Sequence, residues 1–269
     1  MGESEIAIHP MAGLMRRFAV DWLDRADVAV TEEIMAAGYT VHIGGVVLEG
    51  REAYAPATAG QLAQFPGLTI TVHDVLYAAG DRAALRFTEH GASAKGGAAA
   101  WRGIGLFRAE GGQLVHNVVE EDYLARRRQL VGGVADPVDP PMVAPWTEPV
   151  GEPDPDAEKQ VRAWLEALGP VGPGVTWDDA RLGDAPDPLL EVSGCEVREV
   201  FSAGGRVAFH AVQRGRYAGG LPDVDAAVGR AAELSMVGLV APGPDGVVTG
   251  HVVRDRLGLR RVLSKATRA

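Results

Sequence analysis

A predicted strand at residues 113–122 ends in Asp122, a residue that could act as a general base. Strand alternation separates its side chains onto two faces: His116, Val118, Glu120 and Asp122 on one, and Asn117, Val119 and Glu121 on the other. Burial of a carboxylate without a partner is costly, and that cost raises its pKa toward a useful range. The aspartate could instead only cap the segment that follows, residues 123–130.

The strand predicted at residues 82–90 places Arg86, Thr88 and His90 on a shared face. Arg86 could bind an anionic or enolate oxygen, could pair with Asp122, or could be a surface arginine. These alternatives remain open at the level of sequence.

Two further side chains are candidates on neighbouring strands. His42 could donate or accept a hydrogen bond near neutral pH, or could be a satisfied structural histidine. Trp101 is expected either in the core or in the wall of a pocket.

Motifs for metal, cofactor or nucleophilic chemistry are absent from the sequence. Cys195 is the single cysteine, and no HxH, HExxH or CxxC spacing occurs, so His73 and His116 would need a third converging ligand. No GxGxxG follows a strand, and neither a Walker loop nor a GxSxG elbow is present. We therefore expect no metal, no cofactor and no covalent nucleophile.

The elements that would position these residues are helices followed by antiparallel strands. Apolar spacing and stop signals predict helices at residues 10–23, 27–37 and 51–64. Alternation and Gly turns predict strands at residues 39–43, 68–77, 82–90, 101–109 and 113–122. This order predicts an α+β fold, in which helices cover one face of a curved antiparallel sheet and leave a cone-shaped cavity.

A Pro/Gly-rich stretch at residues 132–155 divides the chain into a domain at residues 1–131 and a second at residues 156–269. The two halves repeat a pattern of strands and Gly turns, because residues 72–97 resemble 197–220 and residues 104–130 resemble 237–263. Asp122 and Asp255 fall at equivalent places. Two such copies predict a pseudo-dimer within one chain.

The second half has a shorter front than the first. Residues 156–168 predict one amphipathic helix, residues 169–188 offer little helix, and about eight residues are inserted near residues 221–228. We therefore expect a less complete cavity, with a possible second site formed by Asp255, His251 and His210.

Composition and charge limit the classes of partner. The chain has 269 residues, 46% of them hydrophobic, and a formal net charge of −10, which disfavours nucleic acid. No apolar run approaches the roughly 20 residues of a membrane span. With one cysteine and no signal-like N-terminus, we expect a cytoplasmic protein.

Several motifs in the first half are similar to those of the SnoaL-like polyketide cyclases, within the nuclear-transport-factor-like and ketosteroid-isomerase-like superfamily. The resemblance covers about residues 35–132, and the second half matches only in its final strands. The motifs are Tyr39-Thr40-Val41-His42, Gly50-Arg51-Glu52-Ala53-Tyr54, Phe65-Pro66-Gly67-Leu68, Gly80-Asp81-Arg82, Trp101-Arg102-Gly103-Ile104, and Gly112-Gln113-Leu114-Val115-His116 with Asp122.

The resemblance implies a cofactor-free cyclase or isomerase of secondary metabolism that acts on an apolar, carbonyl-bearing molecule, such as a polyketide, by aldol-type ring closure. It implies Asp122 as the base, with His116, Arg86 and His42 as positioning or oxyanion groups. Residues expected to bind substrate are Trp101, Thr88, His90, Val118, Tyr39 and Tyr54. The second half would complete the dimer in a monomeric or weakly dimeric protein.

Two alternatives stay open. Epoxide opening to a cyclic ether needs an acid and a base carboxylate, which could be Asp122 with Glu120 or Glu89. A noncatalytic binding or assembly module would use Asp122 only as a cap. Aldol or isomerase chemistry exchanges a carbon-bound proton with water, whereas epoxide opening does not.

Overall fold

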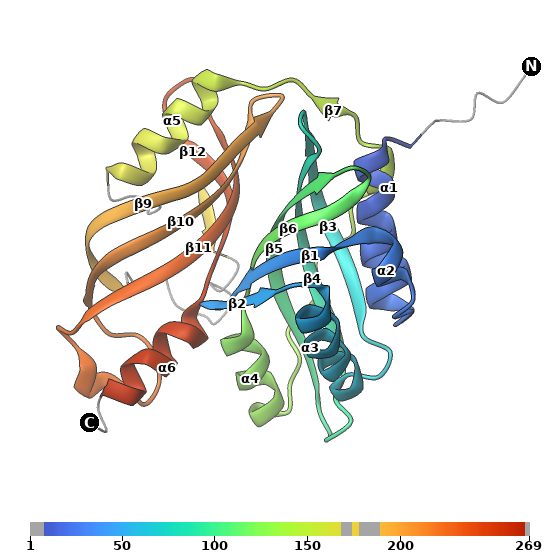
Figure 1. The fold of residues 1–269 in the computed structure, drawn as a ribbon. Coiled ribbons are helices and arrows are strands. Elements are labelled where there is room, and N and C mark those ends of the chain that lie inside the picture. Colours follow the sequence, from blue (N-terminus) through green and yellow to red (C-terminus); the bar gives the residue numbers. More distant parts are fainter. Residues whose placement is uncertain (1–7, 168–173, 178–188, 267–269) are drawn as a thin grey trace, which may run out of the picture.

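Two sheets packed face to face form the frame of the molecule (Figure 1). The computed structural model describes residues 8–167, 174–177 and 189–266. The first sheet has the strand order β2-β1-β6-β5-β4-β3-β7, and the second has the order β8-β12-β11-β10-β9. Most pairs are antiparallel, but β1 runs parallel to β6, β7 runs parallel to β3, and β8 runs parallel to β12.

The first half begins with helices and continues as a meander of strands. Its elements are α1 (Pro10–Arg16), η1 (Arg17–Asp24), α2 (Val30–Ile34), β1 (Met35–Ile43), β2 (Val46–Glu49), α3 (Arg51–Gln64), β3 (Thr69–Ala78), β4 (Arg82–Ala92), β5 (Ala98–Glu110), β6 (Gln113–Glu121) and α4 (Tyr123–Gly132).

The remainder of the chain repeats the strands with fewer helices in front of them. Its elements are η2 (Pro145–Thr147), β7 (Val150–Gly151), α5 (Pro155–Glu166), β8 (Val175–Trp177), β9 (Leu190–Ala203), β10 (Arg206–Tyr217), η4 (Asp225–Ala227), β11 (Ala231–Pro242), β12 (Val248–Arg254) and α6 (Arg256–Ala266).

Local signals place most of these elements, and the main difference lies at α2. The helix predicted to reach residue 37 ends at Ile34, because Met35 already pairs with Leu114 of β6 and starts a longer β1. The short strands β2 and β7 were not expected from the sequence. Most of residues 169–188, where little helix is predicted, lie outside the described residues.

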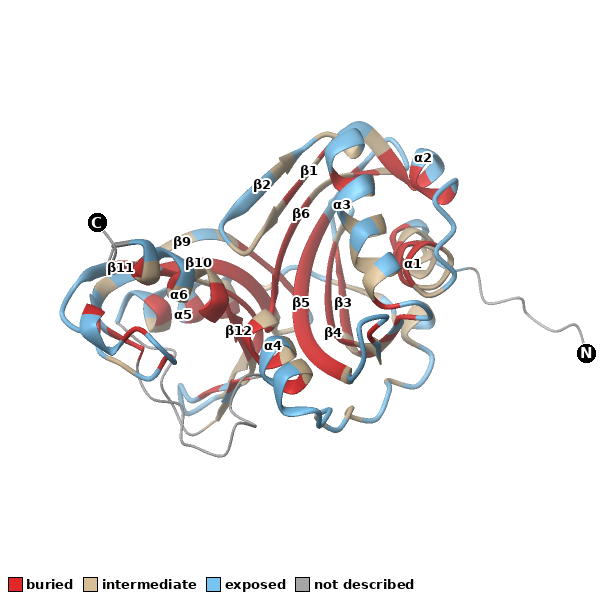
Figure 2. Ribbon diagram, turned by 90° about the horizontal axis from the view of Figure 1, so that it is seen from below, coloured by how far each residue is buried: buried red, intermediate tan, exposed pale blue. Residues whose placement is uncertain are grey.

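Each sheet has an outer face covered by helices and an inner face turned toward the other sheet. On the outer face of the first sheet, α1, η1 and α3 bury a core that includes Met15, Trp22 and Tyr39. On the outer face of the second sheet, α5 buries Val161 and Leu165 against β10 and β12. The buried residues (red) form continuous runs along the central strands in Figure 2.

The two inner faces share one apolar core. Ile104, Leu106 and Val118 of the first sheet pack with Val237 and Leu239 of the second, together with seven other buried residues. Apolar burial of this kind stabilises association in proportion to the area removed from water. The two units therefore form a pseudo-dimer within one chain.

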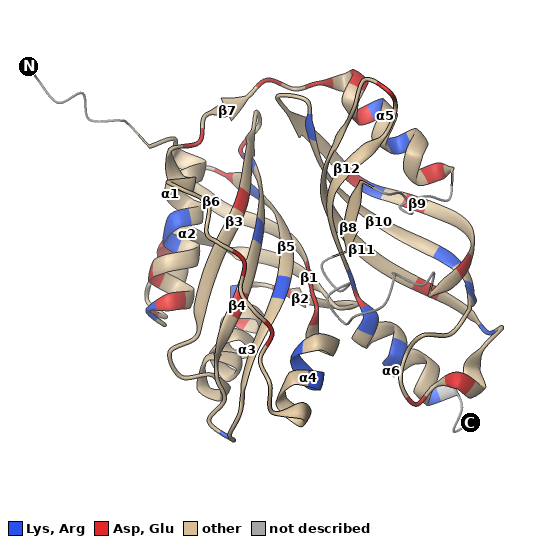
Figure 3. Ribbon diagram, turned by 180° about the vertical axis from the view of Figure 1, so that it is seen from behind, with Lys and Arg blue, Asp and Glu red and all other residues tan. Residues whose placement is uncertain are grey.

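The Pro-rich segment between the halves lies against the first sheet. The Asp139 carboxylate accepts hydrogen bonds from Arg86 and Arg102, each at 3.1 Å. The Met142 N–H donates to the Val72 carbonyl at 2.8 Å, and β7 adds to the sheet beside β3. Figure 3 shows acidic residues of this segment beside basic residues of β4 and β5. The segment is thus held in place over much of its length.

No helix among the described residues is long and apolar enough to cross a membrane.

Candidate active site

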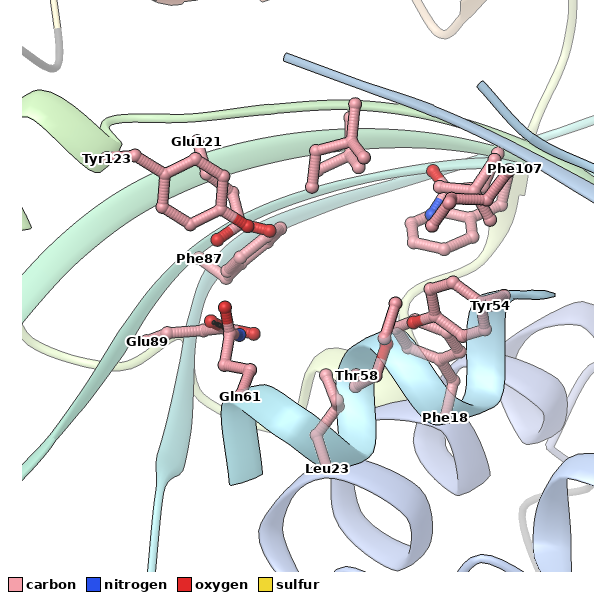
Figure 4. A pocket seen from close by; sticks show the side chains of 16 residues that line it. Phe18, Leu23, Tyr54, Thr58, Gln61, Phe87, Glu89, Phe107, Glu121 and Tyr123 are labelled. Atoms are coloured by element: carbon pink, nitrogen blue, oxygen red, sulfur yellow. Dashed lines mark hydrogen bonds between the residues drawn. The ribbon is translucent and has the colours of Figure 1, made fainter. Parts of the chain in front are cut away.

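A cavity of about 150 Å³ lies between the outer face of the first sheet and the helices η1 and α3 (Figure 4). Most of its wall is apolar: Phe18, Leu23, Val41, Ile43, Leu48, Tyr54, Ala57, Phe87, Phe107 and Val119. A smaller set is polar: Thr58, Gln61, Glu89, Asn117, Glu121 and Tyr123. An apolar pocket with a few convergent polar groups is the usual form of a small-molecule site.

Two glycines of β5 make the floor of the cavity possible. A Cβ at Gly103 would stand 2.4 Å from Cζ of Phe87 and 3.0 Å from Cγ of Glu121. A Cβ at Gly105 would stand 2.8 Å from Cε2 of Phe107. Because neither position has a side chain, Phe87 and Glu121 can lie over Gly103, and Phe107 can lie over Gly105.

The decisive polar feature is a pair of buried carboxyl groups, Glu89 from β4 and Glu121 from β6. Both are less than one-tenth exposed, and they are hydrogen-bonded to each other. Two carboxyl groups in such contact share a proton, because both cannot be ionised at this distance without strong repulsion. Figure 4 shows both side chains directed toward the same end of the cavity.

Neighbouring donors distinguish the two carboxyl groups. Trp101 Nε1 donates to Glu121 Oε2 at 2.7 Å, and the Tyr123 hydroxyl also donates to Glu121. Gln61 Nε2 donates to Glu89 Oε2 at 2.7 Å. Two donors from the protein therefore stabilise a negative charge on Glu121, whereas only one supports Glu89.

Arg126 of α4 completes this network from behind. Its guanidinium lies over the rings of Tyr123 at 4.2 Å and Trp101 at 4.9 Å, and it donates to Gln61 Oε1 at 3.0 Å. The cation thus lies near the carboxyl pair and holds its partners in place.

Burial raises the pKa of Glu89 well above its usual range, and the nearby charge of Glu121 adds to that rise. Burial also raises the pKa of Glu121, but the hydrogen bond from Trp101 and the charge of Arg126 oppose the rise. The proton therefore resides on Glu89, and Glu121 is the carboxylate.

The predicted base, Asp122, lies on the opposite face of the chain from this cavity. It is 1% exposed, caps α4 by accepting from the Ala125 N–H at 3.1 Å, and pairs with Arg256 Nη2 at 2.5 Å. The cavity is on the face of β6 that carries Asn117, Val119 and Glu121. Asp122 therefore caps a helix and forms a buried ion pair. Its position outside the cavity does not support the predicted role as a base.

Two other side chains of the Asp122 face point toward the second sheet. Val118 belongs to the core shared by both sheets. His116 is half-buried, with its ring 5.2 Å from that of His42, and burial and this second histidine lower its pKa. His42 and His116 are thus brought together, but between the sheets and outside the cavity.

The predicted group on β4 also lies away from the cavity. Arg86 pairs with Asp139, Thr88 Oγ1 is 2.7 Å from His73 Nε2, and His90 Nε2 is 2.9 Å from Thr71 Oγ1. These contacts tie β4 to β3 and to the Pro-rich segment.

Three of the predicted binding residues do belong to the cavity region. Tyr54 lines the cavity, and its ring packs edge-on against that of Tyr39 at 5.3 Å. Tyr39 is fully buried behind it, and burial raises its pKa. Trp101 acts through Glu121, to which it donates.

The residues proposed for a second site lie on three different elements of the second half or at their ends. Asp255 caps α6 by accepting from the Gly258 N–H at 2.7 Å. His210 Nε2 is 3.1 Å from Ser235 Oγ on the inner face, and burial lowers its pKa to about 4. His251, on β12, lies opposite Leu239 of β11.

Sequence reasoning missed Glu121, Gln61, Tyr123 and Asn117 as site residues. Alternation separated Glu121 and Asn117 from Asp122 correctly, but nothing local indicated which face the helices cover. The spacing of Gly103 and Gly105 on one face of β5 was an available signal, because large side chains lie over both glycines, Phe87 and Glu121 over Gly103 and Phe107 over Gly105.

Among residues 8–167, 174–177 and 189–266, no three His, Cys, Asp or Glu side chains gather into a set that could hold a metal ion.

Comparison with known families bears on the first half. Residues 15–117 match the model of the SnoaL-like domain. The first half of this chain contains a SnoaL-like domain. The residues that line the cavity lie within this matched range, except for Val119, Glu121 and Tyr123, which follow it directly.

Solved structures similar to the SnoaL-like domain include a proposed SnoaL-like polyketide cyclase from Jannaschia sp. CCS1, with 19% identity over 48% of this chain and 96% of that chain (TM-score 0.42). IdmH, a proposed polyketide cyclase from Streptomyces antibioticus, shows 19% identity over 46% of this chain and 99% of its own (TM-score 0.41). A protein with a ketosteroid isomerase-like fold from Catenulispora acidiphila, solved with trimethylamine, shows 18% identity over 44% of this chain and 92% of its own (TM-score 0.40). A search of curated proteins finds no match.

Proposed function

We propose that the SnoaL-like domain is an acid–base enzyme that needs no cofactor and acts on a small, apolar, carbonyl-bearing molecule. Glu121 is the base and Glu89 is the acid. The observation that carries this proposal is the hydrogen-bonded pair of buried carboxyl groups in the wall of an otherwise apolar cavity. Environments that separate the pKa values of two carboxyl groups assign one as acid and the other as base.

In the proposed reaction, the Glu121 carboxylate removes a proton from the carbon beside the carbonyl. The C–H electrons form a carbon–carbon double bond, and the carbonyl oxygen takes the proton from Glu89. In ring closure, the enol carbon attacks a second carbonyl, and the enol O–H proton passes to the oxygen of that carbonyl. In isomerisation, Glu121 delivers its proton to another carbon while the enol O–H returns its proton to Glu89. The hydrogen bond between the two carboxyl groups offers a path for the proton to return from Glu121 to Glu89.

The size of the cavity limits the substrate. An apolar cavity of about 150 Å³ accepts a ligand the size of benzene, and this cavity has that volume. We therefore propose a single-ring substrate or a short chain that closes to one ring, rather than a fused polycyclic polyketide.

Hydrogen exchange in deuterated water tests this proposal. We expect the protein to accelerate exchange of the methyl protons of acetophenone, followed by proton NMR, above the buffer rate. Because general base catalysis is worth about 10²–10⁴-fold, Glu121→Gln should lose most of that acceleration. Asp122→Asn is the matched control, since Asp122 lies outside the cavity and should retain exchange. Undiminished exchange in Glu121→Gln would exclude the proposed base.

Epoxide opening is a second candidate, favoured by the presence of a neutral carboxyl group directly beside a carboxylate. Glu89 would protonate the epoxide oxygen as the C–O bond breaks, and Glu121 would take the proton from an attacking hydroxyl group or water. Turnover of styrene oxide to its diol, without exchange of carbon-bound hydrogen in acetophenone, would favour this reaction over the first.

We also propose that residues 1–131 and 156–269 are two domains of a protein that works as a monomer, joined through residues 132–155. The shared apolar core of the inner faces supports this proposal, because it already fills the surface that each sheet would offer to another copy. A mass near 28.3 kDa by light scattering is the expected result.

A further inference from the structure

The orientation of the Gln61 side-chain amide decides what the acid of the carboxyl pair meets. An amide has a donor side, its NH2 group, and an acceptor side, its oxygen. Gln61 Nε2 donates to Glu89 Oε2 at 2.7 Å, and Figure 4 shows the two side chains in contact. If the amide were turned over, its oxygen would face Glu89 and would accept the proton that the proposed reaction gives to the substrate.

Arg126 on α4 fixes which side of the amide faces Glu89. Its Nη1 donates to Gln61 Oε1 at 3.0 Å. A guanidinium group has several donors and no acceptor, so the amide can present only its oxygen to Arg126. The NH2 group of Gln61 is thereby directed to Glu89.

Three aromatic rings hold the Arg126 guanidinium in this position. Its central carbon lies 4.2 Å from the ring centre of Tyr123, 4.9 Å from that of Trp101 and 5.7 Å from that of Phe65. Contacts of a cation with ring faces are attractive at these distances. Gln61 lines the cavity, whereas Arg126 is not among the described residues that line it. Arg126 therefore acts from behind the cavity wall.

We propose that Arg126 is a positioning residue for the acid. By holding Gln61 Oε1, it keeps the Gln61 NH2 group on Glu89 and so leaves the Glu89 proton to the substrate. No bond to Arg126 or Gln61 forms or breaks in the reaction, because both act by orientation. This inference rests on the proposed function, in which Glu89 is the acid.

Substitutions of Arg126 in the full-length protein test this role through exchange of the methyl protons of acetophenone. Arg126→Met keeps an unbranched side chain against the rings but cannot donate, so kcat should fall about 10-fold, the effect of one net hydrogen bond. KM should stay unchanged, because Arg126 lies outside the cavity wall. Arg126→Lys, which also carries only donors, should recover most of kcat. Arg127→Met, at an exposed position of the same helix, is the matched control.

A double variant shows whether Arg126 acts through Gln61. Gln61→Leu already lacks both hydrogen bonds, so Arg126→Met should cause no further loss of kcat in that background. Each variant is measured at the pH of its own maximal rate, because the charge of Arg126 also lowers the pKa of both Glu89 and Glu121. Additive losses would overturn the proposal, since Arg126 would then act by its charge and not through the amide.

NMR of the side-chain amides reports the orientation of Gln61 without turnover. The pair of NH2 peaks that is missing from Gln61→Leu belongs to Gln61. These peaks should shift and exchange faster with deuterated water in Arg126→Met, and should stay in place in Arg127→Met. Unchanged peaks or an unchanged kcat in Arg126→Met would overturn the proposal. Undiminished exchange of acetophenone in Glu121→Gln would instead remove the proposed base, while the NH2 peaks still test the contact between Arg126 and Gln61.

Discussion

The two halves of the molecule share a strand frame, but their described helices cover the outer faces of the sheets differently: a mostly apolar cavity with a few polar groups lies under the helices of the first half. In the first half, η1 and α3 stand away from the sheet and leave space above β5 and β6. In the second, α5 packs directly on the sheet, where Val161 and Leu165 join a core with Phe209 and Met236. The strands alone therefore do not make a site, because the helices that precede them determine whether space remains.

The second half also lacks an acidic residue at the position that corresponds to Glu121. Asp122 N–H bonds to the Arg102 carbonyl, and Asp255 N–H bonds to the Ser235 carbonyl, which aligns the two repeats. One residue earlier, Glu121 corresponds to Arg254, whose guanidinium lies 4.1 Å from the ring centre of Trp177.

The strand pairing extends this alignment to the second member of the carboxyl pair. Glu89 is opposite Trp101, and Gln213 is opposite Leu234, so Glu89 corresponds to Gln213. Neither carboxyl group of the first half has an acidic counterpart in the second. The comparison teaches that the two halves share the strand frame, while the buried carboxyl pair and the cavity beside it belong to the first half, which is where we propose the chemistry.

The capping aspartates give the largest test of this comparison. Asp122→Asn keeps a good capping residue but removes the buried negative charge that Arg256 Nη2 contacts, so we expect a loss of about 3 kcal/mol in the free energy of unfolding. Asp255→Asn, the equivalent change, should cost about 1 kcal/mol or less, since asparagine caps nearly as well. Urea denaturation measures both. Loss of acetophenone exchange in Asp122→Asn, with the fold retained, would restore Asp122 as the base.

Two glycines that lie under phenylalanine rings offer a matched pair of substitutions. Gly103→Ala would place a Cβ 2.4 Å from Phe87, and Gly238→Ala would place one 2.2 Å from Phe209. Each should cost about 2 kcal/mol of stability through overpacking. Only Gly103→Ala should also slow exchange, because it displaces Glu121. Equal slowing in both variants would contradict the confinement of chemistry to the first half.

The smallest expected effect concerns Glu120, whose equivalent in the second half is the apolar Val253. Burial and the nearby carboxylate of Asp255 raise the pKa of Glu120 to about 8, against an ordinary value of 4.5. The folded protein therefore keeps a proton that the unfolded chain releases, and stability present below pH 4.5 is lost as the pH rises through 8. The slope contributed by one such group is at most about 1.4 kcal/mol per pH unit.

Denaturation of Glu120→Gln between pH 6.5 and 8 tests this directly. His210, with a pKa lowered to about 4, is neutral in the folded protein across this range, and its contribution to the slope is the same in both proteins and cancels in their comparison. The variant should lose about one proton's share of the slope, while the strongly raised pKa of Glu89 keeps its own contribution in both proteins. An unchanged slope would mean that Glu120 is already ionised between the sheets.

Much of the fold follows from short-range signals in the sequence. Residues 51–64 form the predicted helix, and each of the five strands predicted for the first half begins and ends within a few residues of its predicted bounds. The departure at residues 35–37 comes from a long-range pair, Met35 with Leu114, which local propensity does not record. The repeat of Asp122 and Asp255 also holds in the structure, as two equivalent caps.

By itself, the sequence determined the order of elements, the internal repeat, and the division of β6 side chains into two faces. Only the tertiary structure decided which face holds the site. Alternation is a property of the backbone of one strand, and it is the same whichever layer covers that strand. The helices η1 and α3 cover the face of β6 that carries Asn117 and Glu121, and the second sheet covers the face that carries Val118 and Asp122. Adjacent residues therefore have different roles: Glu121 is a candidate base, and Asp122 is a helix cap.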